Sequence, residues 1–553
     1  MKVYEAVLEQ MIRSGVRCFA GMVGSTSAPY IAHLAQRPDI RYVAVRHEQV
    51  AAALTEATAR LTGVPGCVIA HGGSGLLAAS LGVASAALDS TPMLILSATQ
   101  ERVAMERGWW QTMDVLRPVG DLVKWQTRVE RPDQAVRAVR QGLREAVSGR
   151  PGVVQIDLPI DVSIAALEGE RPADTGHYQA PLIRPWPDPS SVNSAVARLE
   201  KATRPVILIG GGASYAGAGE AILRIAERLH APIVNTATSR AVVPETHPLV
   251  LGPSGILGYE PIGQAIRESD LILAIGSRLS DLQLSRTELL PSGIPIVQVD
   301  IDAAVIGRDH AVTLGIVSDA RAFAESLVRA LDVKELPVPP ARHEWVNTLI
   351  AGIETWQAAW FEGVPDNGKV QPQELVRSLW GLPTGTIFTH GAGDHGFYGF
   401  MVPVASPGEH LMSSRLGAMG CALGFGLGAK LVRPEQPVVA CVGDGDLMLQ
   451  IGDLETLSRE RLGVVLVVFN NFRLGSQRKR VEAYGPIMGV DHGNPDFAKL
   501  AELFGCRGYR VDQPGQFHAA LVDALSTGEP CIIDVIIDPD ARPPRAQVSR
   551  EAR

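Results

Sequence analysis

Two polar clusters directly follow apolar runs in the C-terminal third of the chain. The run "PVVACV" leads into Gly443, Asp444 and Gly445, and the run "VVLVVF" leads into Asn470 and Asn471. A carboxylate, an amide oxygen and a free backbone carbonyl are the hard ligands that Mg²⁺ takes when phosphate groups complete its shell. Glycines let the backbone approach an anion closely, and a helix start behind them offers free N–H groups.

The interval between Asp444 and Asn471 has room for one turn, one helix and one return strand. The carboxyl ends of parallel strands meet at one edge of a sheet, where ligands bind. Taken singly, each motif is typical of an ordinary βα turn or loop. The pair at this spacing favours a site for Mg²⁺ and a diphosphate.

The elements that must position this site are short β-branched runs alternating with helical patterns, which predict parallel sheets with crossover helices. Pro-rich, polar stretches at 169–191 and 333–345 are typical of linkers. We therefore predict an α/β fold with three consecutive parallel-sheet α/β domains, at 1–170, 190–333 and 365–540. The predicted strands are 41–45, 66–70, 92–98 and 152–159, then 205–212, 232–236, 271–277 and 295–302, then 387–391, 437–443, 464–471 and 531–538.

Composition narrows the class of protein. The 553 residues are 46% hydrophobic and 20% charged, as expected of a soluble globular protein, and the net charge of −8 argues against nucleic-acid and anionic-membrane partners. Six scattered cysteines without a CxxC pair predict reduced thiols and a cytoplasmic location. The N-terminal segment has an amphipathic helical pattern without a signal-peptide core. The weakly polar stretch 67–98 predicts a strand, a buried helix and a strand, not a membrane span.

Here the sequence resembles a known family. The GDG turn and the later NN pair match the diphosphate–Mg signature of thiamine-diphosphate (ThDP) enzymes, and most of the chain resembles acetolactate synthases. "LGAMGCALGFGLGAKL" (416–431) resembles the segment whose methionine props the cofactor, "VVFNNFRLG" (467–475) the Mg loop, and 298–319 a strand and loop of the central domain. The resemblance implies a pyrimidine-binding, a central and a diphosphate-binding domain, in that order.

The resemblance also implies which residues hold the cofactor. Met419 would be the prop, and the Gly417 carbonyl would accept from the cofactor's aminopyrimidine. The implied metal ligands are Asp444, Asn471 and Arg473. The implied cofactor-binding residues are Glu48, Ala392, His395, Gly417, Met419, Gly443, Asp444, Gly445, Asp446, Asn471, Leu474 and Gly475.

An acid is needed at the other end of the cofactor. In the family, a glutamate after the second strand of the first domain protonates the aminopyrimidine, so that the C2 ylide forms and an enamine intermediate follows. "YVAVRHEQVAAAL" (42–54) places Glu48 there, at the start of a predicted helix. Burial would raise its pKa and keep it protonated. The alternative is a first-turn acid that complements the helix dipole.

Three more residues are candidates for the reaction itself. Ser25 lies in "GMVGSTSAPY" (21–30), which corresponds to the family loop beside the thiazolium; the alternative is a simple Gly/Ser turn. His71 falls where benzoylformate decarboxylase carries an active-site histidine, although that enzyme's second histidine is replaced near Gln283. A structural role at a strand end is the alternative for His71. Gln111 matches a family glutamine near the cofactor.

The sequence departs from acetolactate synthases in two places. Ser476 and Arg480 stand where the family has an apolar residue and a tryptophan; a guanidinium can pair with a carboxylate or phosphate, although a solvated basic face is the alternative. The segment 275–285 keeps Arg278 and Asp281 but loses the family's run of paired aspartates and arginine. This argues against FAD and leaves ADP or coenzyme A as further candidate ligands.

The predicted function is a ThDP- and Mg-dependent enzyme that forms or cleaves a C–C bond of a 2-oxo acid, as an acetolactate synthase-like carboligase. A decarboxylase or lyase, of the benzoylformate decarboxylase or 2-hydroxyacyl-CoA lyase type, is the first alternative. A non-catalytic cofactor-binding homologue is the second. The expected partners are a small 2-oxo acid or acyl substrate and further copies of the chain, as a homodimer or homotetramer, because family cofactors lie between two subunits.

Overall fold

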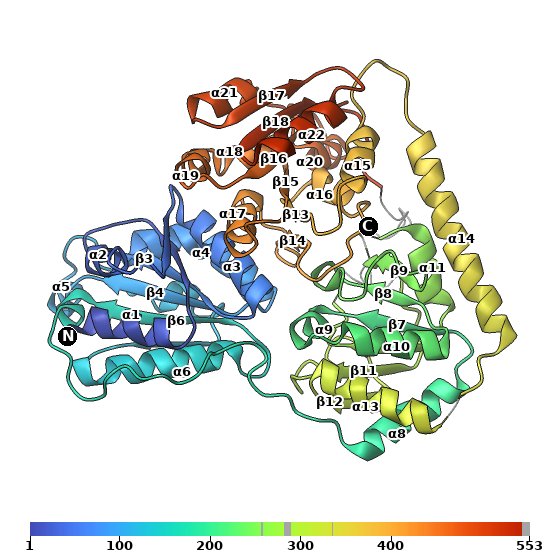
Figure 1. Cartoon of the computed structure of the whole chain (residues 1–553), viewed down its shortest axis with the longest axis horizontal. Helices are drawn as coiled ribbons and strands as arrows, with labels where there is room; N and C mark the ends of the chain where they lie inside the picture. Colours follow the sequence, from blue (N-terminus) through green and yellow to red (C-terminus); the bar gives the residue numbers. More distant parts are fainter. Residues whose placement is uncertain (256–257, 281–288, 335, 545–553) are drawn as a thin grey trace.

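The computed structural model describes residues 1–255, 258–280, 289–334 and 336–544, and the account below covers these residues. They form three six-stranded sheets, one after another along the chain, with helices packed against each (Figure 1). Every pairing between named strands is parallel, and this confirms the predicted α/β class. Asp281 and Gln283, on which two of the comparisons above depend, lie outside the described residues.

The first and third sheets share one strand order, and the central sheet has another. The first sheet, in the order β2-β1-β3-β4-β6-β5, comprises β1 (Cys18–Gly21), β2 (Arg41–Ala44), β3 (Gly66–His71), β4 (Met93–Thr99), β5 (Trp125–Arg128) and β6 (Val153–Pro159). The central sheet, in the order β12-β11-β10-β7-β8-β9, comprises β7 (Pro205–Ile209), β8 (Ile233–Asn235), β9 (Val250–Pro253), β10 (Leu271–Ile275), β11 (Ile296–Asp300) and β12 (Leu314–Val317). The third, in the order β14-β13-β15-β16-β18-β17, comprises β13 (Ile387–His390), β14 (His410–Met412), β15 (Val438–Gly443), β16 (Val464–Asn470), β17 (Arg507–Val511) and β18 (Cys531–Ile536).

Helices connect the strands. Those of the first unit are α1 (Val3–Arg13), α2 (Ala28–Leu34), α3 (Glu48–Thr62), α4 (Gly72–Leu88), α5 (Arg102–Glu106), α6 (Ala135–Val147) and α7 (Ile160–Ser163). The central unit has α8 (Pro189–Lys201), α9 (Gly211–Ala216), α10 (Gly219–Leu229), α11 (Glu260–Glu268) and α13 (Ala320–Val333), and α14 (Pro340–Glu362) leads away from it. The third unit has α15 (Pro372–Trp380), α16 (Asp394–Gly399), α17 (Ala422–Val432), α18 (Asp444–Met448), α19 (Leu454–Arg459), α20 (Gly475–Glu482), α21 (Phe497–Leu503) and α22 (Phe517–Thr527).

Each strand order contains a point where successive connections leave in opposite directions. That point lies between β1 and β3, between β7 and β10, and between β13 and β15. Crevices at such points, outside the carboxyl ends of the strands, are where open α/β sheets bind ligands. Each of the three sheets therefore offers one such position.

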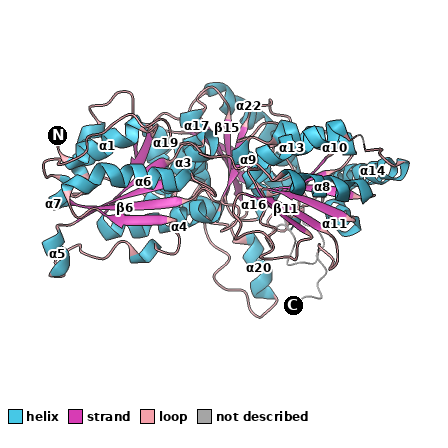
Figure 2. Cartoon of the chain, turned by 90° about the horizontal axis from the view of Figure 1, so that it is seen from below, coloured by secondary structure: helices cyan, strands magenta, loops and turns pink. Residues whose placement is uncertain are grey.

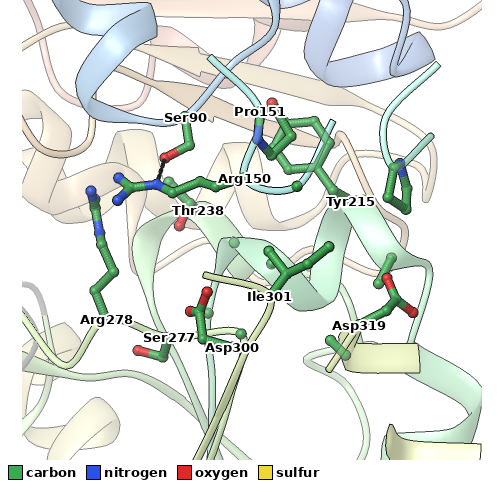
Figure 3. A pocket seen from close by; sticks show the side chains of 18 of the residues that line it. Ser90, Arg150, Pro151, Tyr215, Thr238, Ser277, Arg278, Asp300, Ile301 and Asp319 are labelled. Carbon is green, nitrogen blue, oxygen red and sulfur yellow. Dashed lines mark hydrogen bonds between the residues drawn. The ribbon is translucent and has the colours of Figure 1, made fainter. Parts of the chain in front are cut away.

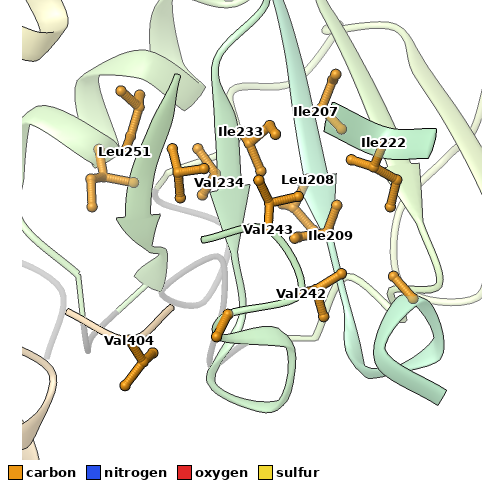
Figure 4. Packing of buried hydrophobic residues seen from close by; sticks show 14 of the residues in the cluster. Ile207, Leu208, Ile209, Ile222, Ile233, Val234, Val242, Val243, Leu251 and Val404 are labelled. Carbon is orange, nitrogen blue, oxygen red and sulfur yellow. The ribbon is translucent and has the colours of Figure 1, made fainter. Parts of the chain in front are cut away.

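The sheets are built from strands that are buried on both faces. All seven residues of β4, β6 and β16 are buried, which explains their continuous apolar runs, since helices cover both sides of a parallel sheet. In the central unit, Ile207, Leu208 and Ile233 pack against neighbouring side chains from α10 and the β9 region, and Val404 of the third unit lies close by (Figure 4). The central and third units thus share one hydrophobic core.

Helix α3 ties the first unit to the third. It is buried along most of its length, and alanines of α3 pack against glycines of α17. A Cβ at Gly428 would lie 2.3 Å from the Leu54 carbonyl oxygen, and one at Gly424 would lie 2.6 Å from the Ala53 Cβ. The two helices therefore approach as closely as backbones allow, and α3 begins with Glu48.

Two helices lie at the periphery, although α14 contributes Trp345, Val346 and Leu349 to the shared core. The long helix α14 runs along the outside of the molecule between the central and third units (Figure 1). Helix α20 contains no buried residue and projects from the body of the molecule (Figure 2). Within the described ranges, no helix combines the length and the apolar character needed to cross a bilayer.

Candidate functional site

The two strand ends identified from the sequence meet in the structure. Strands β15 and β16 are neighbours, with Gly443 in register with Phe469. Asn494, from the loop before α21, joins the two ends because its amide donates to Asp444 Oδ2 (2.8 Å) and to Asn470 Oδ1 (2.9 Å). The Asn470 amide is used inside the sheet, where it donates to Asp534 Oδ1 (2.9 Å). Of the asparagine pair, Asn471 is therefore the one left at the turn.

The GDG turn is closely packed on its inner side. A Cβ at Gly443 would lie 2.8 Å from His395 Nδ1, and a Cβ at Gly445 would lie 2.8 Å from Leu474 Cδ2 and 3.9 Å from Met419 Cε. A side chain at either position would therefore force His395 or Leu474 to shift. Met419 and Leu474, from two loops, and His395, from the first turn of α16, converge on this turn.

Asp446 holds the neighbouring loops together. Its carboxylate accepts the backbone N–H groups of Gly420 (2.7 Å) and Ala392. Burial raises its pKa to about 7 despite these two bonds. Asp446 therefore fixes the Met419 segment against the loop before α16, and so holds these two segments of the site in place.

The Mg loop contains the other predicted ligands. Asn471 Nδ2 lies within 2.9 Å of the point where a Gly475 Cβ would stand, and Asp394 Oδ2 lies within 3.0 Å of the same point. The Arg473 side chain turns away toward Asp540 (3.3 Å) and Asp491 (3.7 Å), so only its backbone carbonyl is a candidate ligand. In the described ranges, no group of three or more His, Cys, Asp or Glu side chains could hold a metal. One carboxylate and one amide oxygen thus need phosphate oxygens to complete a shell.

A second cluster lies at the carboxyl ends of strands in the first sheet. Glu48 begins α3 as predicted; it is buried, and burial raises its pKa. Its Oε1 lies 3.1 Å from the point where a Gly75 Cβ would stand. His71, at the end of β3, forms a hydrogen bond between its Nδ1 and Thr26 Oγ1 (2.6 Å), which anchors the loop that exposes Ser25.

Gln111 lies near this cluster in a strained backbone conformation. Its φ of 60° is left-handed, and its side-chain oxygen accepts from Gln100 Nε2 (3.3 Å). Its carbonyl oxygen lies 3.9 Å from the point where a Gly72 Cβ would stand, directly after His71. A non-glycine residue with positive φ costs conformational energy that surrounding contacts must offset, and such residues cluster at functional sites.

Hydrogen bonds join the first unit to the Met419 segment. Gln49, next to Glu48, donates to the carbonyl oxygens of Met419 (2.6 Å) and Gly420 (2.9 Å). Upstream, Asp89 accepts the backbone N–H groups of Ser414 (2.7 Å) and Arg415 (3.0 Å). The segment that carries Gly417 and Met419 is therefore held from both sides by the first unit.

The predicted substrate residues lie on α20. Ser476 is partly exposed in the first turn, and Arg480 is exposed one turn later. Arg478 of this helix pairs with Asp491 (3.1 Å), so part of the basic run has a partner in the chain. Among the described residues, Arg480 has no contact that joins it to the Asp444 turn.

A separate pocket lies at the switch point of the central sheet, against the first unit. Gly210–Gly212, after β7, line it together with Asp300 after β11, Arg278, and Arg150 of the first unit. Figure 3 shows Arg150, which donates to Ser90 Oγ (2.8 Å), and Arg278 on the same side of the pocket. Burial and the neighbouring Arg150 and Arg415 charges lower the pKa of Arg278 to about 9, and its Nη1 has no partner in the described chain. The pocket thus presents two guanidinium groups on one side, and the carboxylates of Asp89, Asp300 and Asp319 also line it.

Sequence reasoning missed several residues that build the main site. Asn494 and Gln49 make hydrogen bonds across it, and His492 Nε2 lies 3.6 Å from Asp444 Oδ2. "HGNPDF" (492–497) resembles an ordinary loop with a helix start, and only proximity in space reveals its relation to the GDG turn. No sequence motif indicates a role for Gln49 apart from its position next to Glu48.

The main site fits a diphosphate with Mg²⁺. Three polar atoms around it, His395 Nε2, His492 Nε2 and Asn494 Oδ1, are buried and have no hydrogen-bond partner among the described residues. Buried polar groups are normally paired, so such atoms indicate a missing ligand or water. Asp444 and Asn471 follow the adjacent strands β15 and β16 and offer oxygen atoms of the kind Mg²⁺ takes, and Asp444 stands between two glycines.

Comparison with known proteins identifies the class. The sequence matches the thiamine pyrophosphate enzyme N-terminal TPP binding domain over residues 1–117, the central domain over 192–327 and the C-terminal TPP binding domain over 391–535. Three such domains in the order that the three sheets follow define a thiamine-diphosphate-dependent enzyme, and the chain belongs to this family.

Within the family, the chain is acetolactate synthase-like. It is 29% identical to a probable acetolactate synthase large subunit of Methanocaldococcus jannaschii, over 98% of this chain and 92% of the relative. It is 29% identical to an acetolactate synthase of Arthrospira platensis, over 97% and 94%. It is 28% identical to the acetolactate synthase isozyme 3 large subunit of Escherichia coli, also over 97% and 94%.

Proposed function

We propose that this enzyme is an Mg-dependent carboligase that joins a 2-oxo acid to a second carbonyl compound. The observation that carries the proposal is that β15 and β16, which lead into Asp444 and Asn471, end side by side, next to buried polar atoms that have no partner among the described residues. When bound, ThDP supplies an electron sink for the bond made or broken beside the carbonyl. The proposed domains, 1–170, 190–333 and 365–540, each contain one of the three sheets.

We assign the residues around the GDG turn roles in binding the metal and the cofactor. Asp444, Asn471 and the Arg473 carbonyl would hold Mg²⁺, and the backbone of Gly443, Gly445 and Gly475 would lie against the diphosphate. Met419 and Leu474 would shape the apolar wall. Ala392, Gly417 and His395 would line the remaining edge of the site, and Asp446 would hold their loops in place. These roles rest on the convergence of Met419, Leu474 and His395 at the GDG turn.

Glu48 would hold and move the proton at the aminopyrimidine end. Its burial and raised pKa support this role, because a protonated carboxyl can donate at neutral pH. Ser25, His71 and Gln111, from the same cluster, would contact the substrate. Since this cluster belongs to the first unit, we propose a homodimer in which the cluster of one copy faces the GDG turn of the other.

The surface beside the cluster supports this assembly. Helix α4 directly follows His71, and two of its leucines are exposed: Leu77 by 49% and Leu81 by 39%. Apolar side chains in such a row are typical of a covered surface. Sedimentation should give a dimer or tetramer, and Leu77→Glu with Leu81→Glu should shift it toward monomer and lower ThDP affinity.

The deciding experiment is incubation of the enzyme with Mg²⁺, ThDP and a panel of 2-oxo acids and acyl-CoA compounds. Mass spectrometry of the products and CO₂ release would distinguish ligation from simple decarboxylation. A carboligase gives a larger hydroxy-oxo acid, whereas a decarboxylase or lyase of the first alternative gives an aldehyde. Absence of any product despite bound ThDP would favour a non-catalytic homologue.

Arg480 would select the substrate in place of an aromatic wall. A charge-assisted contact with an anionic group contributes about 1.5–3 kcal/mol, which corresponds to roughly 10–150-fold. Arg480→Trp should weaken use of the natural anionic substrate by about that factor and favour less charged acceptors, while ThDP affinity stays unchanged. An unaltered substrate preference would assign Arg480, with Ser476, to a solvated surface.

The pocket of the central sheet would bind a nucleotide such as ADP or the nucleotide part of coenzyme A. Gly210–Gly212 bring backbone close to a ligand at the switch point, Arg150 and Arg278 would pair with phosphates, and Asp300 would accept from ribose hydroxyls. Calorimetry with ADP, coenzyme A and FAD, using Arg278→Met as the comparison, tests this assignment. All six cysteines are unpaired, which supports a reducing, cytoplasmic setting.

A further inference from the structure

His492 lies over the diphosphate end of the main site, although no sequence motif marks it. Its Cε1 stands 3.7 Å from the point where a Gly445 Cβ would lie, so the imidazole covers the second glycine of the GDG turn. Its Nε2 is buried and has no hydrogen-bond partner in the described ranges. The nearest acid oxygen, Asp444 Oδ2, is 3.6 Å away, which is too long for a hydrogen bond.

The backbone fixes this imidazole in place. The His492 N–H donates to the Phe472 carbonyl (3.1 Å), and the Leu474 N–H donates to the Val490 carbonyl (2.7 Å). Between these bonds, Arg473 and Asp491 face each other as an isolated antiparallel pair. These contacts close the base of the segment that carries α20 and hold the His492 backbone beside the loop of Asn471.

Asn494 sets the neighbouring acceptors. Its amide already donates to Asp444 and Asn470, and its own Oδ1 is buried without a partner in the described chain. The Asp444 oxygen nearest His492 is therefore already satisfied by Asn494. In the described ranges, an N–H at His492 Nε2 has no acceptor within hydrogen-bonding distance, and the imidazole lies beside Gly445 of the GDG turn.

We propose that His492 binds the diphosphate of ThDP, donating from Nε2 to a phosphate oxygen, and that Asn494 is a positioning residue that orients Asp444 for the metal. The inference rests on the proposed function, since it requires ThDP at this turn. An imidazole N–H above two N–H-bearing glycines suits a phosphate oxygen, which accepts several donors at once. The His492 side chain as a whole is 30% exposed, although its Nε2 atom is covered.

The test measures ThDP affinity directly by calorimetry at saturating Mg²⁺. Losing a hydrogen bond to a charged group should raise the ThDP Kd roughly 10–150-fold in His492→Ala. His492→Gln retains an N–H donor at similar reach and should recover most of that loss. The control is His518→Ala, an exposed histidine on α22 of the same unit, which should leave the Kd unchanged.

A magnesium titration separates the two roles. Asn494→Ala should weaken ThDP binding at limiting Mg²⁺ and recover as Mg²⁺ is raised, because it acts through Asp444. His492→Ala should not recover. Wild-type ThDP affinity in a folded His492→Ala variant overturns the proposal for His492, whereas a wild-type chain that binds no ThDP refutes the proposed function itself. Equal loss in the Gln and Ala variants also overturns the proposal, because it shows that the donor is not what matters.

Discussion

The close approach of α3 and α17 allows a sharp test of how the fold positions Glu48. Gly428→Ala places a methyl group that would lie 2.3 Å from the Leu54 carbonyl oxygen and 2.8 Å from the Ala57 Cβ. The first of these is a backbone atom of a buried helix and cannot rotate away. The contact must lengthen to at least 3.0 Å, so the helices must separate.

The magnitude follows from a matched control. Gly352→Ala makes the same change inside α14, where the new Cβ would have only ordinary contacts with Pro261 at 3.7 and 3.8 Å. Both variants gain about 1 kcal/mol in helix propensity. Overpacking costs typically 1–3 kcal/mol, and only Gly428→Ala incurs it. The difference between the two variants is therefore about 1–3 kcal/mol.

Thermal unfolding measures this difference. One kcal/mol corresponds to about 2–4 °C for a domain of 150–250 residues, so Gly428→Ala should melt roughly 2–12 °C below Gly352→Ala. It should also weaken ThDP binding, since α17 follows directly on the Met419 segment and α3 begins with Glu48. If both variants are equally stabilised, the packing of α3 against α17 is not as tight as the structure has it.

Three more substitutions test the site and the fold. Glu48→Gln should lower turnover by about 10²–10⁴-fold with ThDP still bound, as expected for a proton-transfer group; near-wild-type rates would contradict that role. Asp444→Ala should weaken ThDP binding measured by calorimetry, with partial rescue by excess Mg²⁺; an unchanged affinity would exclude a metal ligand. Burial lowers the pKa of His390 from its usual 6.5 to about 3. The neutral His390 therefore contributes fully to the free energy of unfolding above pH 6.5. This contribution falls by about 1.4 kcal/mol per pH unit as the pH drops toward 3. The melting temperature of His390→Leu should accordingly fall less than that of the wild type between pH 7 and pH 5, and parallel profiles would refute the shift.

The pH test of His390 needs the His390→Leu variant as a reference, because buried acids change the free energy of unfolding with pH in the opposite direction. Burial raises the pKa of Glu56 and of Asp446, so the folded chain binds protons that the unfolded chain has released. These groups stabilise the fold at low pH and lose that contribution as the pH rises. The wild-type profile sums both effects, and only the difference between the two proteins isolates His390.

Most interior strands could be predicted from the sequence, whereas most edge strands could not; the edge strand β2, predicted at 41–45, is an exception. The predicted runs correspond to strands such as β4, β10 and β16, because strands buried on both faces are continuously apolar. Edge strands such as β5 (Trp125–Arg128) and β17 (Arg507–Val511) contain partly exposed polar residues and show no apolar run. β1 was missed despite its interior place, since four residues beginning with Cys18 form too short a pattern.

Some residues of the site could be predicted from local sequence motifs, whereas others belong to it only through contacts between segments distant in the sequence. Glu48, Asp444 and Asn471 follow apolar runs directly, so that a strand end and its spacing predict their position. His492 and Asn494 lie in a loop whose amino-acid sequence predicts only a turn and a helix start. Their relation to Asp444 depends on the way β15, β16 and the segment 472–491 fold back on one another.

The placement of α3 between two functional loops explains why its sequence is so rich in alanine. Its first turn carries Glu48 and Gln49, and the Gln49 amide reaches the Met419 and Gly420 carbonyls only if the helix backbones nearly touch. Larger side chains at Ala53 or Ala57 would separate α3 from α17 as surely as a methyl group on Gly428. Because side-chain volume along this contact sets the separation of the two helices, residues far from any ligand control where the first turn of α3 and the Met419 segment stand. The small side chains of α3 are therefore part of the positioning of the site.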